Sequence, residues 1–370
     1  MRRLLLVSHR WLGRLLILPM LLQASTGIVL AVAPAFDNLS GAAHSGIAGP
    51  PRQPSEVLAA ALRAAPPGLQ AMRYRPPGQA HEMAVIDLGR TGQRLPAMRM
   101  LIDPVSLVVV ATDTHPDRVL RFVHRLHEVL LVPGPLGHQL IGWFGIGLLL
   151  MTATGIWNWW QRTGRWRGLA MIFRNARRFR LQLELHGLAG IWLAVMLLLQ
   201  AVSGASMAFP ETFAAMLGLP APTRSGGHPH DPPKALDIDA VMARAISLAP
   251  HAEAVDIRLP GNSGRPLTVI LRRNGSTLQP ATIITMTPDA SRVLTIQDPA
   301  TQPFRAGILI WMRALHSATV LGPAWRVLVT VSGVALFLLS LTGGLMWLFR
   351  HRIQPRRAAS AVVRRAAIPR

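Results

Sequence analysis

Two histidines have the spacing expected of ligands to a planar cofactor inside a membrane. His9 begins the pattern His-x3-Gly, and an apolar run then leads to Gln-Ala-Ser-Thr-Gly27. The same pattern recurs from His186 to Gly204, and in both copies the last glycine comes 18 residues after the histidine. Eighteen residues make five helical turns, so the histidine and the glycine share one face. The histidine would supply an axial ligand, and glycines on its face would leave room for a macrocycle.

Two more histidines belong to a second repeated element. His127 and His316 each precede a Gly-Pro pair, an apolar run and a Thr-Gly pair, and both copies have 21 residues from the first of these glycines to the last. The chain therefore reads as two tandem copies of a helix, an outer segment and a helix. A pseudo-twofold bundle would bring His9 to His186 and His127 to His316. Two facing imidazoles make a bis-histidine site for b-type haem, which suits electron transfer because no axial position is open.

Other assignments of these histidines remain open. All four could be interfacial side chains that anchor helix ends. His138 also begins a His-x3-Gly pattern and could replace His127 as a ligand, while its repeat counterpart, Arg326, could contact a haem propionate. His124 is a weaker candidate on the same face as His127. The cluster His228-Pro-His-Asp231 is not taken as a metal site, and no metal beyond haem iron is expected.

Composition and charge place the chain in a membrane. Of 370 residues, 50% are hydrophobic and 15% are charged, with a mean hydropathy of +0.32. Such values indicate several spans. Eighteen of the 39 basic residues fall in three patches beside apolar runs, at 2–14, 162–180 and 350–370. This is the positive-inside pattern, so the net charge of +22 indicates topology and not a nucleic-acid partner. The absence of cysteine excludes disulfides, iron–sulfur clusters and c-type haem.

The predicted fold class is a membrane protein with an all-α four-helix transmembrane bundle and two small α+β outer domains. Both termini and the central basic loop are expected in the cytoplasm. A cleaved signal peptide is the alternative for the first helix, since Ala31-Val-Ala-Pro-Ala resembles a cleavage site, but the internal copy at 186–204 favours a retained helix. The expected segments are transmembrane helices at 1–34, 119–161, 182–209 and 306–350, outer domains at 35–118 and 210–305, a basic loop at 162–181 and a basic tail at 351–370.

At these residues the chain resembles the PepSY-associated transmembrane-helix family of bacterial iron-regulated membrane proteins. The resemblance covers residues 5–350 and rests on the His-x3-Gly, Leu-His and Thr-Gly…Trp motifs of both copies. The segment Met100-Leu-Ile-Asp-Pro104 also resembles the strand–turn–strand end of a PepSY domain. The resemblance implies a multi-pass protein of the bacterial inner membrane with periplasmic PepSY domains. Members include ferrisiderophore reductases that carry haem, so it also implies haem and iron reduction. Together with the two facing histidine pairs, the expected cofactor is haem b, two per chain.

The expected function is transmembrane electron transfer, although no catalytic residue is assigned. Electrons would enter from the cytoplasm, pass the His9/His186 site and the His127/His316 site, and reduce a ferric siderophore or other ferric chelate in the periplasm. No G-x-G-x-x-G unit is present, so the donor would be a separate cytoplasmic reductase or a membrane quinol. The alternatives are a non-catalytic PepSY protein that binds a periplasmic partner such as a peptidase, and a metal or proton transporter. Because the apolar runs contain no Asp or Glu, a transporter is disfavoured.

Overall fold

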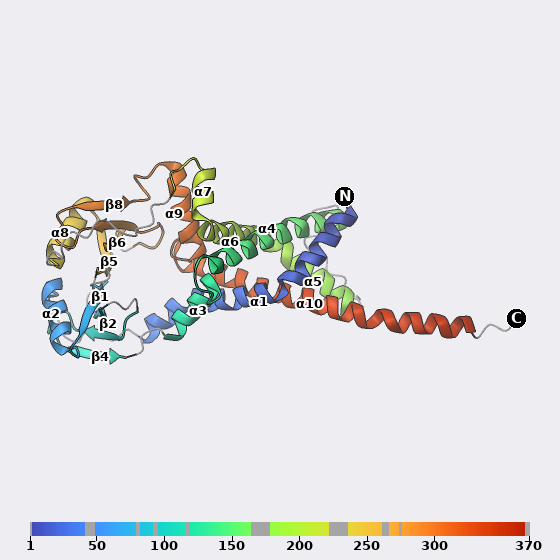
Figure 1. Cartoon of the computed structure of the whole chain (residues 1–370), viewed down its shortest axis with the longest axis horizontal. Coiled ribbons are helices and arrows are strands. Elements are labelled where there is room, and N and C mark those ends of the chain that lie inside the picture. The colour runs from blue at the N-terminus through green and yellow to red at the C-terminus, as the bar shows by residue number, and fades with distance from the viewer. Residues whose placement is uncertain are drawn as a thin grey trace.

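The structure is a computed structural model in which a bundle of helices joins an eight-stranded sheet (Figure 1). The sheet lies at one end of the bundle, and the N-terminus of the chain lies at the other end. The structure describes residues 2–40, 49–78, 82–91, 95–114, 118–163, 178–221, 236–260, 266–273 and 276–366.

Three helices are long and apolar enough to cross a membrane. They are α1 (Arg2–Ser40), α4 (Pro135–Thr163) and α10 (Gly322–Ala366), with candidate spans of 32, 27 and 28 residues. About 20 residues suffice to cross the hydrocarbon core. A fourth span is present only if α5 (Arg178–Trp192) and α6 (Ala194–Ala208) are counted together, because the chain bends by 63° between them. The described chain is thus a membrane protein with three spans, or four if the bent pair is one.

The bend corrects the prediction of one straight helix over 182–209. Leu193 takes φ −99° and ψ 2°, which lies outside the α-helical region. His186 and Gly204 therefore lie on different helices, α5 and α6. In the first copy α1 continues without a break through both His9 and Gly27, so the five-turn argument holds there alone.

The other two histidines lie on short helices of their own, α3 (Arg118–Val129) and α9 (Phe304–His316). The elements expected at 119–161 and 306–350 are therefore each a short helix followed by a span, and the first of them breaks before Pro135, where the sequence Pro133-Gly-Pro135 predicts a break. Gly134 and Gly322 occupy the turns before these spans with φ of 75° and 72°, a conformation that glycine adopts without steric cost.

The helices pack as a pseudo-twofold arrangement predicts. α1 packs against α10, α4 packs against α6, and α1 also contacts α4. Each copy's first helix thus meets the other copy's last span. Small residues allow this close approach: a Cβ at Gly147 would lie 2.8 Å from the side chain of Leu16, and one at Gly145 would lie 3.3 Å from the carbonyl of Ala201. The short helix α7 (Pro210–Met216) follows α6.

The outer parts of both copies form one antiparallel sheet in the order β4-β3-β2-β1-β5-β6-β7-β8. The fold class is therefore not purely all-α, and the two expected outer domains are halves of one sheet. The halves meet where Tyr74 pairs with Ile257, which covers an edge that each half alone would leave open. The strands are β1 (Leu69–Arg75), β2 (Ala84–Arg90), β3 (Met98–Ile102), β4 (Val109–Asp113), β5 (Ala252–Arg258), β6 (Leu267–Arg273), β7 (Thr282–Met286) and β8 (Val293–Gln297).

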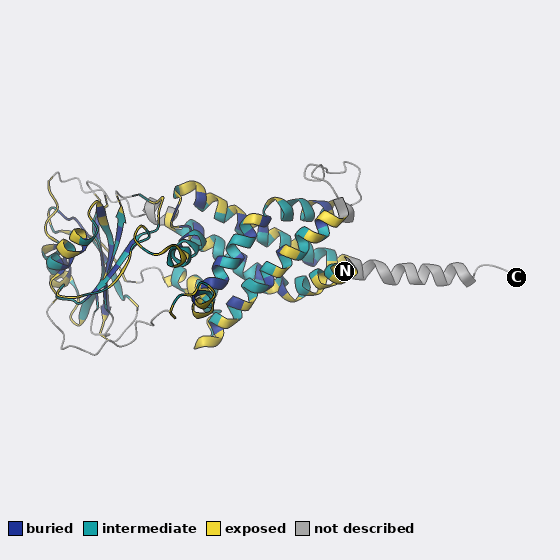
Figure 2. Cartoon of the chain, turned by 90° about the horizontal axis from the view of Figure 1, so that it is seen from above, coloured by how far each residue is buried: buried dark blue, intermediate teal, exposed yellow. Residues whose placement is uncertain are grey.

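Two helices cover one face of the sheet, α2 (Pro54–Ala64) and α8 (Ile238–Leu248). Both lie on the side of the sheet away from the bundle (Figure 1). Alternate strand residues point toward them, so Ile86, Ile257 and Val269 are fully buried together with Val57 of α2 and Val241 of α8. Figure 2 shows this buried layer running across the sheet. The opposite face is turned toward the bundle.

Candidate functional site

Each of the four repeat-related histidines forms a hydrogen bond between its Nδ1 and a hydroxyl on a neighbouring helix. Each bond joins two helices of the same copy, and its hydroxyl belongs to a Thr-Gly or Ser-Gly dipeptide. The distances from Nδ1 to the hydroxyl oxygen are 3.0 Å for His9–Thr154, 2.9 Å for His127–Thr26, 3.0 Å for His186–Thr342 and 3.1 Å for His316–Ser203.

The hydroxyl groups decide which ring nitrogen carries the proton. Each hydroxyl donates its hydrogen to the backbone carbonyl four residues earlier, as Thr26 does to Leu22 at 2.8 Å and the other three do at 2.6–2.7 Å. The hydroxyl oxygen must therefore accept its hydrogen bond from Nδ1–H of the imidazole. This leaves Nε2 of each histidine with a free lone pair, which is the form that binds a metal.

The glycine after each hydroxyl residue makes room for the imidazole. The sequence pattern predicts that glycines on the face of a histidine leave room for a macrocycle, and the structure shows that this glycine also contacts the histidine of a neighbouring helix. Contacts below 3.4 Å are tighter than almost all real Cβ contacts, so three of the four glycines could not gain a methyl group without moving the ring. The distance from an added Cβ on the glycine to Cε1 of the histidine would be 3.3 Å for Gly27 and His127, 3.3 Å for Gly155 and His9, 3.0 Å for Gly204 and His316, and 3.6 Å for Gly343 and His186.

The outer histidines face each other across the two copies. The ring centres of His127 and His316 are 6.2 Å apart, and the ring planes are tilted by 44°. Two imidazoles that bind one iron at about 2 Å from each Nε2 have ring centres about 6 Å apart. The outer pair therefore has the spacing of two axial ligands.

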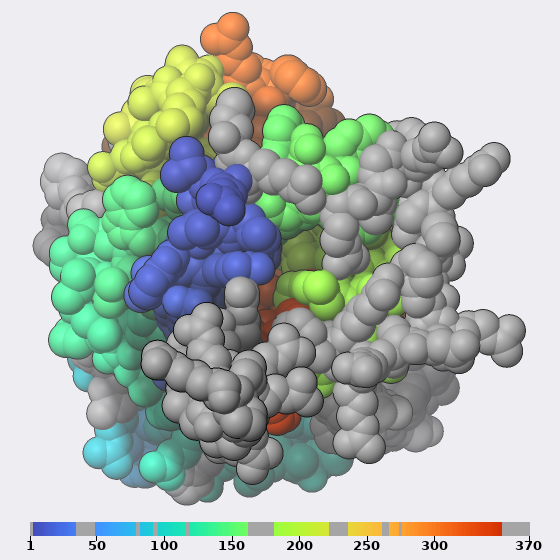
Figure 3. Space-filling model, turned by 90° about the vertical axis from the view of Figure 1, so that its right-hand side faces the viewer, coloured from blue at the N-terminus to red at the C-terminus, as the bar shows by residue number. Residues whose placement is uncertain are grey.

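The inner histidines lie toward the opposite end of the bundle. His186 is within electrostatic range of His9. The start of α1 (blue) and α5 (yellow-green) both reach the surface at this end (Figure 3). The structure thus brings the four histidines together as the sequence predicts, in two pairs with one member from each copy, and metal ligation by them stays a prediction.

Two buried amides near the outer pair have no partner. Nε2 of Gln23 and Nε2 of Gln200 are buried and form no hydrogen bond with any described residue. They are repeat counterparts, and they precede Thr26 and Ser203 by three residues, so each shares a helix face with one of these hydroxyls. A buried amide without a partner costs about 1–3 kcal/mol. Haem offers iron, which imidazoles bind, and polar groups, to which amides can donate. The four imidazoles and these two amides therefore fit a bound haem.

Comparison with known proteins supplies the family. The sequence profile of the family described as PepSY-associated TM region matches residues 6–350. The chain belongs to this family. It is 30% identical over 264 residues to the uncharacterized protein PA4219 of Pseudomonas aeruginosa, which is 62% of this chain and 63% of that relative. The matched region therefore spans less than two thirds of the relative's length. Family membership confirms the suspected resemblance and the membrane class.

His138 and His124 of this PepSY-associated protein have no hydroxyl partner among the described residues. His138 lies in the first turn of α4 and forms no hydrogen bond with the described residues. His124 is 61% exposed at its side chain and lies 3.7 Å from Glu128. His228 and His230 fall outside the described residues. Within the described ranges, no group of three or more metal-binding side chains is present.

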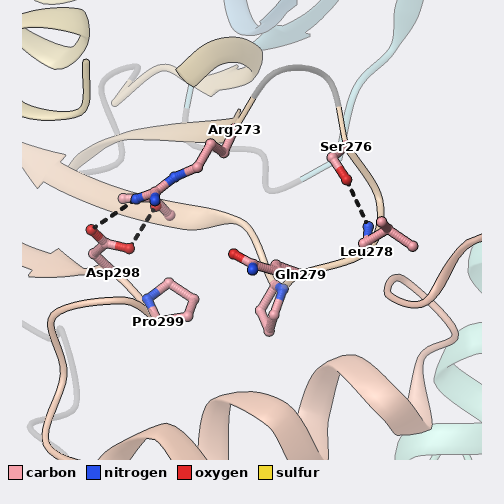
Figure 4. A pocket seen from close by; sticks show the side chains of 8 residues that line it. Arg273, Ser276, Leu278, Gln279, Asp298 and Pro299 are labelled. Atoms are coloured by element: carbon pink, nitrogen blue, oxygen red, sulfur yellow. Dashed lines mark hydrogen bonds and ion pairs between the residues drawn. The ribbon is translucent and has the colours of Figure 1, made fainter. Parts of the chain in front are cut away.

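Two neighbouring cavities lie between the last strands of the sheet and α9 of the PepSY-associated protein. One has a volume of 570 Å³, is lined by α9 and ends at Leu315, directly before His316. The other has a volume of 200 Å³ and contains Arg273, which lies 3.9 Å from Asp298 (Figure 4). Pro299 borders both cavities. The larger one has the size of a small-molecule site, and α9, which lines it, ends at His316.

The hydroxyl–glycine dipeptides are the residues whose role the sequence alone does not reveal. The chain has eleven Thr-Gly or Ser-Gly pairs, but only four of them occupy matched positions of the repeat, one for each of the four histidines. That equality is the available signal. Which histidine each dipeptide contacts depends on packing between helices.

Proposed function

We propose that this protein holds haem b at two bis-histidine sites and carries electrons across a membrane to a ferric chelate. His9 and His186 would form the inner site, and His127 and His316 the outer site. The observation that carries the proposal is the repeated Nδ1–H bond to a hydroxyl whose own hydrogen is already committed, which leaves Nε2 free in every case. When bound, haem would supply a one-electron carrier at each pair of histidines.

The chain's own residues orient the ligands and exclude water. Thr154 and Thr342 hold the inner imidazoles, and Thr26 and Ser203 hold the outer ones. Removing such a partner of a metal-bound histidine typically costs about 10–100-fold in metal affinity. The glycines fix the ring positions, and the apolar helices keep the sites dry.

A four-span bundle in the bacterial inner membrane fits the distribution of charge, with α5 and α6 together forming the fourth span. Arg14 lies 4.6 Å from the ring centre of Trp11 and 5.8 Å from that of Trp347. Basic and aromatic side chains of this kind mark a membrane interface. They lie at the end of the bundle opposite the sheet. Under the positive-inside rule that end and both termini are cytoplasmic, and the sheet is periplasmic.

The proposed substrate is a ferric siderophore or another ferric chelate on the periplasmic side. One electron, supplied by a separate cytoplasmic reductase or a membrane quinol, converts Fe³⁺ to Fe²⁺. The hard oxygen donors of such chelates hold Fe²⁺ less tightly, so reduction releases the metal. The 570 Å³ cavity along α9, the helix that carries His316, would offer the chelate a place to bind.

A reduced-minus-oxidised visible spectrum of the purified full-length protein tests the proposal. A b-type α band and about two haems per chain are expected from the two axial pairs. His186→Ala should remove one half of the haem and His316→Ala the other half. His124→Ala is the matched control on α3, because that side chain is exposed and should leave both haems in place.

Folded protein without haem would refute the proposal and favour the non-catalytic, partner-binding alternative. Full haem content in all the single variants would refute the assignment of these histidines as ligands. If His138→Ala removes one haem while His127→Ala removes none, His138 is the outer ligand.

A further inference from the structure

The face of the sheet turned toward the bundle carries a line of arginines. Tyr74 and Ile257 are buried under α2 and α8, so their neighbours along the strands point to the opposite face. These neighbours are Arg73 and Arg75 on β1 and Arg258 on β5. The strand register aligns Arg258, Arg73, Asp87 and Arg99 across four adjacent strands.

Two carboxylates on this face already serve three of the arginines. Arg73 donates to both carboxylate oxygens of Asp256, at 2.5 and 3.0 Å. Arg258 donates to the same carboxylate at 3.4 Å. Arg99 donates to both oxygens of Asp87, at 2.7 and 3.3 Å. Two carboxylates thus face four arginines, once Arg75 is counted with these three, so the face carries an excess of positive charge.

Arg75 is a fourth guanidinium group on the same face. Its Nε is buried and has no hydrogen-bond partner among the described residues. Burial lowers the pKa of Arg75, and repulsion from Arg73 and Arg99 lowers it further, while Asp87 and Asp256 offset part of this effect. A buried cation in such a place is stabilised by an added anion.

Arg272 on β6 also has a buried guanidinium nitrogen without a hydrogen-bond partner among the described residues. This nitrogen is Nη1, and burial together with the nearby Arg326 lowers the pKa of Arg272. Glu253 lies opposite Arg272 in the β5–β6 ladder, but it is exposed and forms no ion pair with any described residue. Only β5 separates β1 from β6, and strands are spaced by about 4.8 Å, so Arg75 and Arg272 can reach one ligand.

Contacts along the chain link these arginines to the outer histidine pair. Arg272 is close enough to Arg326, near the start of α10, for the two positive charges to repel each other. The residue before Arg326, Trp325, donates from Nε1 to the carbonyl of Leu315 at 2.9 Å. Leu315 directly precedes His316. Arg326 therefore follows the residue that ties the start of α10 to the end of α9, where His316 is located.

We propose that Arg75, Arg272 and Arg326 bind the negatively charged groups of a ferric chelate and so select anionic chelates over cationic ones. Guanidinium groups bind carboxylates through two parallel hydrogen bonds, and they do so most strongly where water is excluded. This inference rests on the proposed function and narrows its substrate class to chelates rich in carboxylate or phenolate oxygens.

Titration calorimetry with gallium(III) citrate tests the charge preference, because gallium is not reduced and the measurement needs no electron donor. Arg272→Gln should weaken binding by about 10–100-fold, as expected for losing a charge-assisted hydrogen bond, and Arg272→Lys should restore part of it. Arg273→Gln is the matched control: it lies next along β6, points to the other face and already faces Asp298. It should bind like the unmodified protein.

A gallium trihydroxamate that carries a free ammonium group should bind at least about tenfold more weakly than the citrate complex and should not respond to Arg272→Gln. Equal binding of the two complexes, or an equal loss in Arg273→Gln, would overturn the inference. Citrate binding should also be the same in nanodiscs with and without phosphatidylglycerol. Its loss in the anionic nanodiscs would assign the arginines to lipid phosphates instead.

A haem spectrum of each sample separates this inference from the proposed function. Protein without haem would refute the proposed function, while the gallium titration would still decide the charge preference. Loss of haem in Arg272→Gln with unchanged citrate binding would place the arginine beside haem and reject the chelate site.

Discussion

Replacing Thr26 by valine would remove one hydroxyl and change little else. Valine has almost the shape of threonine, but it cannot accept the 2.9 Å hydrogen bond from Nδ1 of His127. Thr26 is only 5% exposed, so water could not easily replace the lost acceptor. His127 would then lose the group that keeps its proton on Nδ1, and the ring would populate other tautomers and orientations.

The substitution should weaken haem binding at the outer site alone. Loss of such a partner typically weakens metal binding by about 10–100-fold, or about 1.4–2.7 kcal/mol. One hydrogen bond contributes about 0.5–1.5 kcal/mol to folding, so the fold should survive. Thr26→Ser is the control, because Ser203 plays the same part for His316 at 3.1 Å.

Titration of haem b into haem-free protein, followed by visible absorbance, would measure both sites. Thr26→Val should weaken one site and leave the other unchanged, since His9 lies about 25 Å from Thr26 along α1. Thr26→Ser should bind both haems like the unmodified protein. If the valine variant also binds both haems normally, or if the serine variant is as weak as the valine variant, the hydroxyl does not orient His127.

Three further predictions follow from the structure. Gly204→Ala should displace haem from the outer site more than Gly343→Ala does from the inner site, because the added Cβ would lie 3.0 Å from the ring in the first case and 3.6 Å in the second; haem content per chain measures both. Burial and the nearby Asp239 raise the pKa of Tyr74 to about 12. The unfolded chain therefore loses this proton first, and the free energy of unfolding should fall by about 2–3 kcal/mol between pH 10 and 12; Tyr74→Phe should abolish the fall, and tyrosinate absorbance reports the titration because the chain has one tyrosine. Reporter fusions at residues 170 and 80 should report opposite compartments, and a periplasmic signal at residue 170 would reject the topology.

The sequence predicts what the repeat and the hydropathy determine. The membrane class and the family follow from apolar runs and recurring motifs, and both are confirmed. Equal spacing in two copies also selects the four histidines that the structure places in pairs. The family and the membrane class can be predicted in this way because a repeat compares the chain with itself and needs no knowledge of packing, while the role of the histidines stays a prediction.

Helix breaks are harder to predict from sequence. Pro19 lies inside α1 and yet the helix continues, while the 63° bend occurs at Leu193, where no proline is present. A rule based on helix-breaking residues would therefore bend the wrong helix. The conformation of Leu193 depends on the surroundings of α5 and α6, which the local sequence does not record.

The pairing of the two sheet halves has the same kind of cause. The pattern of β1 identifies a strand, but an edge strand carries no local signal that names its partner. Its contact with β5 joins residues from different copies, such as Tyr74 and Ile257. The contact between each hydroxyl–glycine dipeptide and its histidine is likewise set by packing between helices.

The antiparallel pairing of β1 with β5 is the pairing that two identical half-length chains would make across a twofold axis. Each half-length chain would offer one histidine to each site and one open strand edge, and a symmetric homodimer would complete both sites and cover both edges at once. Duplication and fusion of the gene would turn that homodimer into the present chain. His138 and Arg326 now occupy equivalent positions with different chemistry. A homodimer must place the same side chain on both sides of its axis, whereas a fused chain can give the two sides of one site different charges.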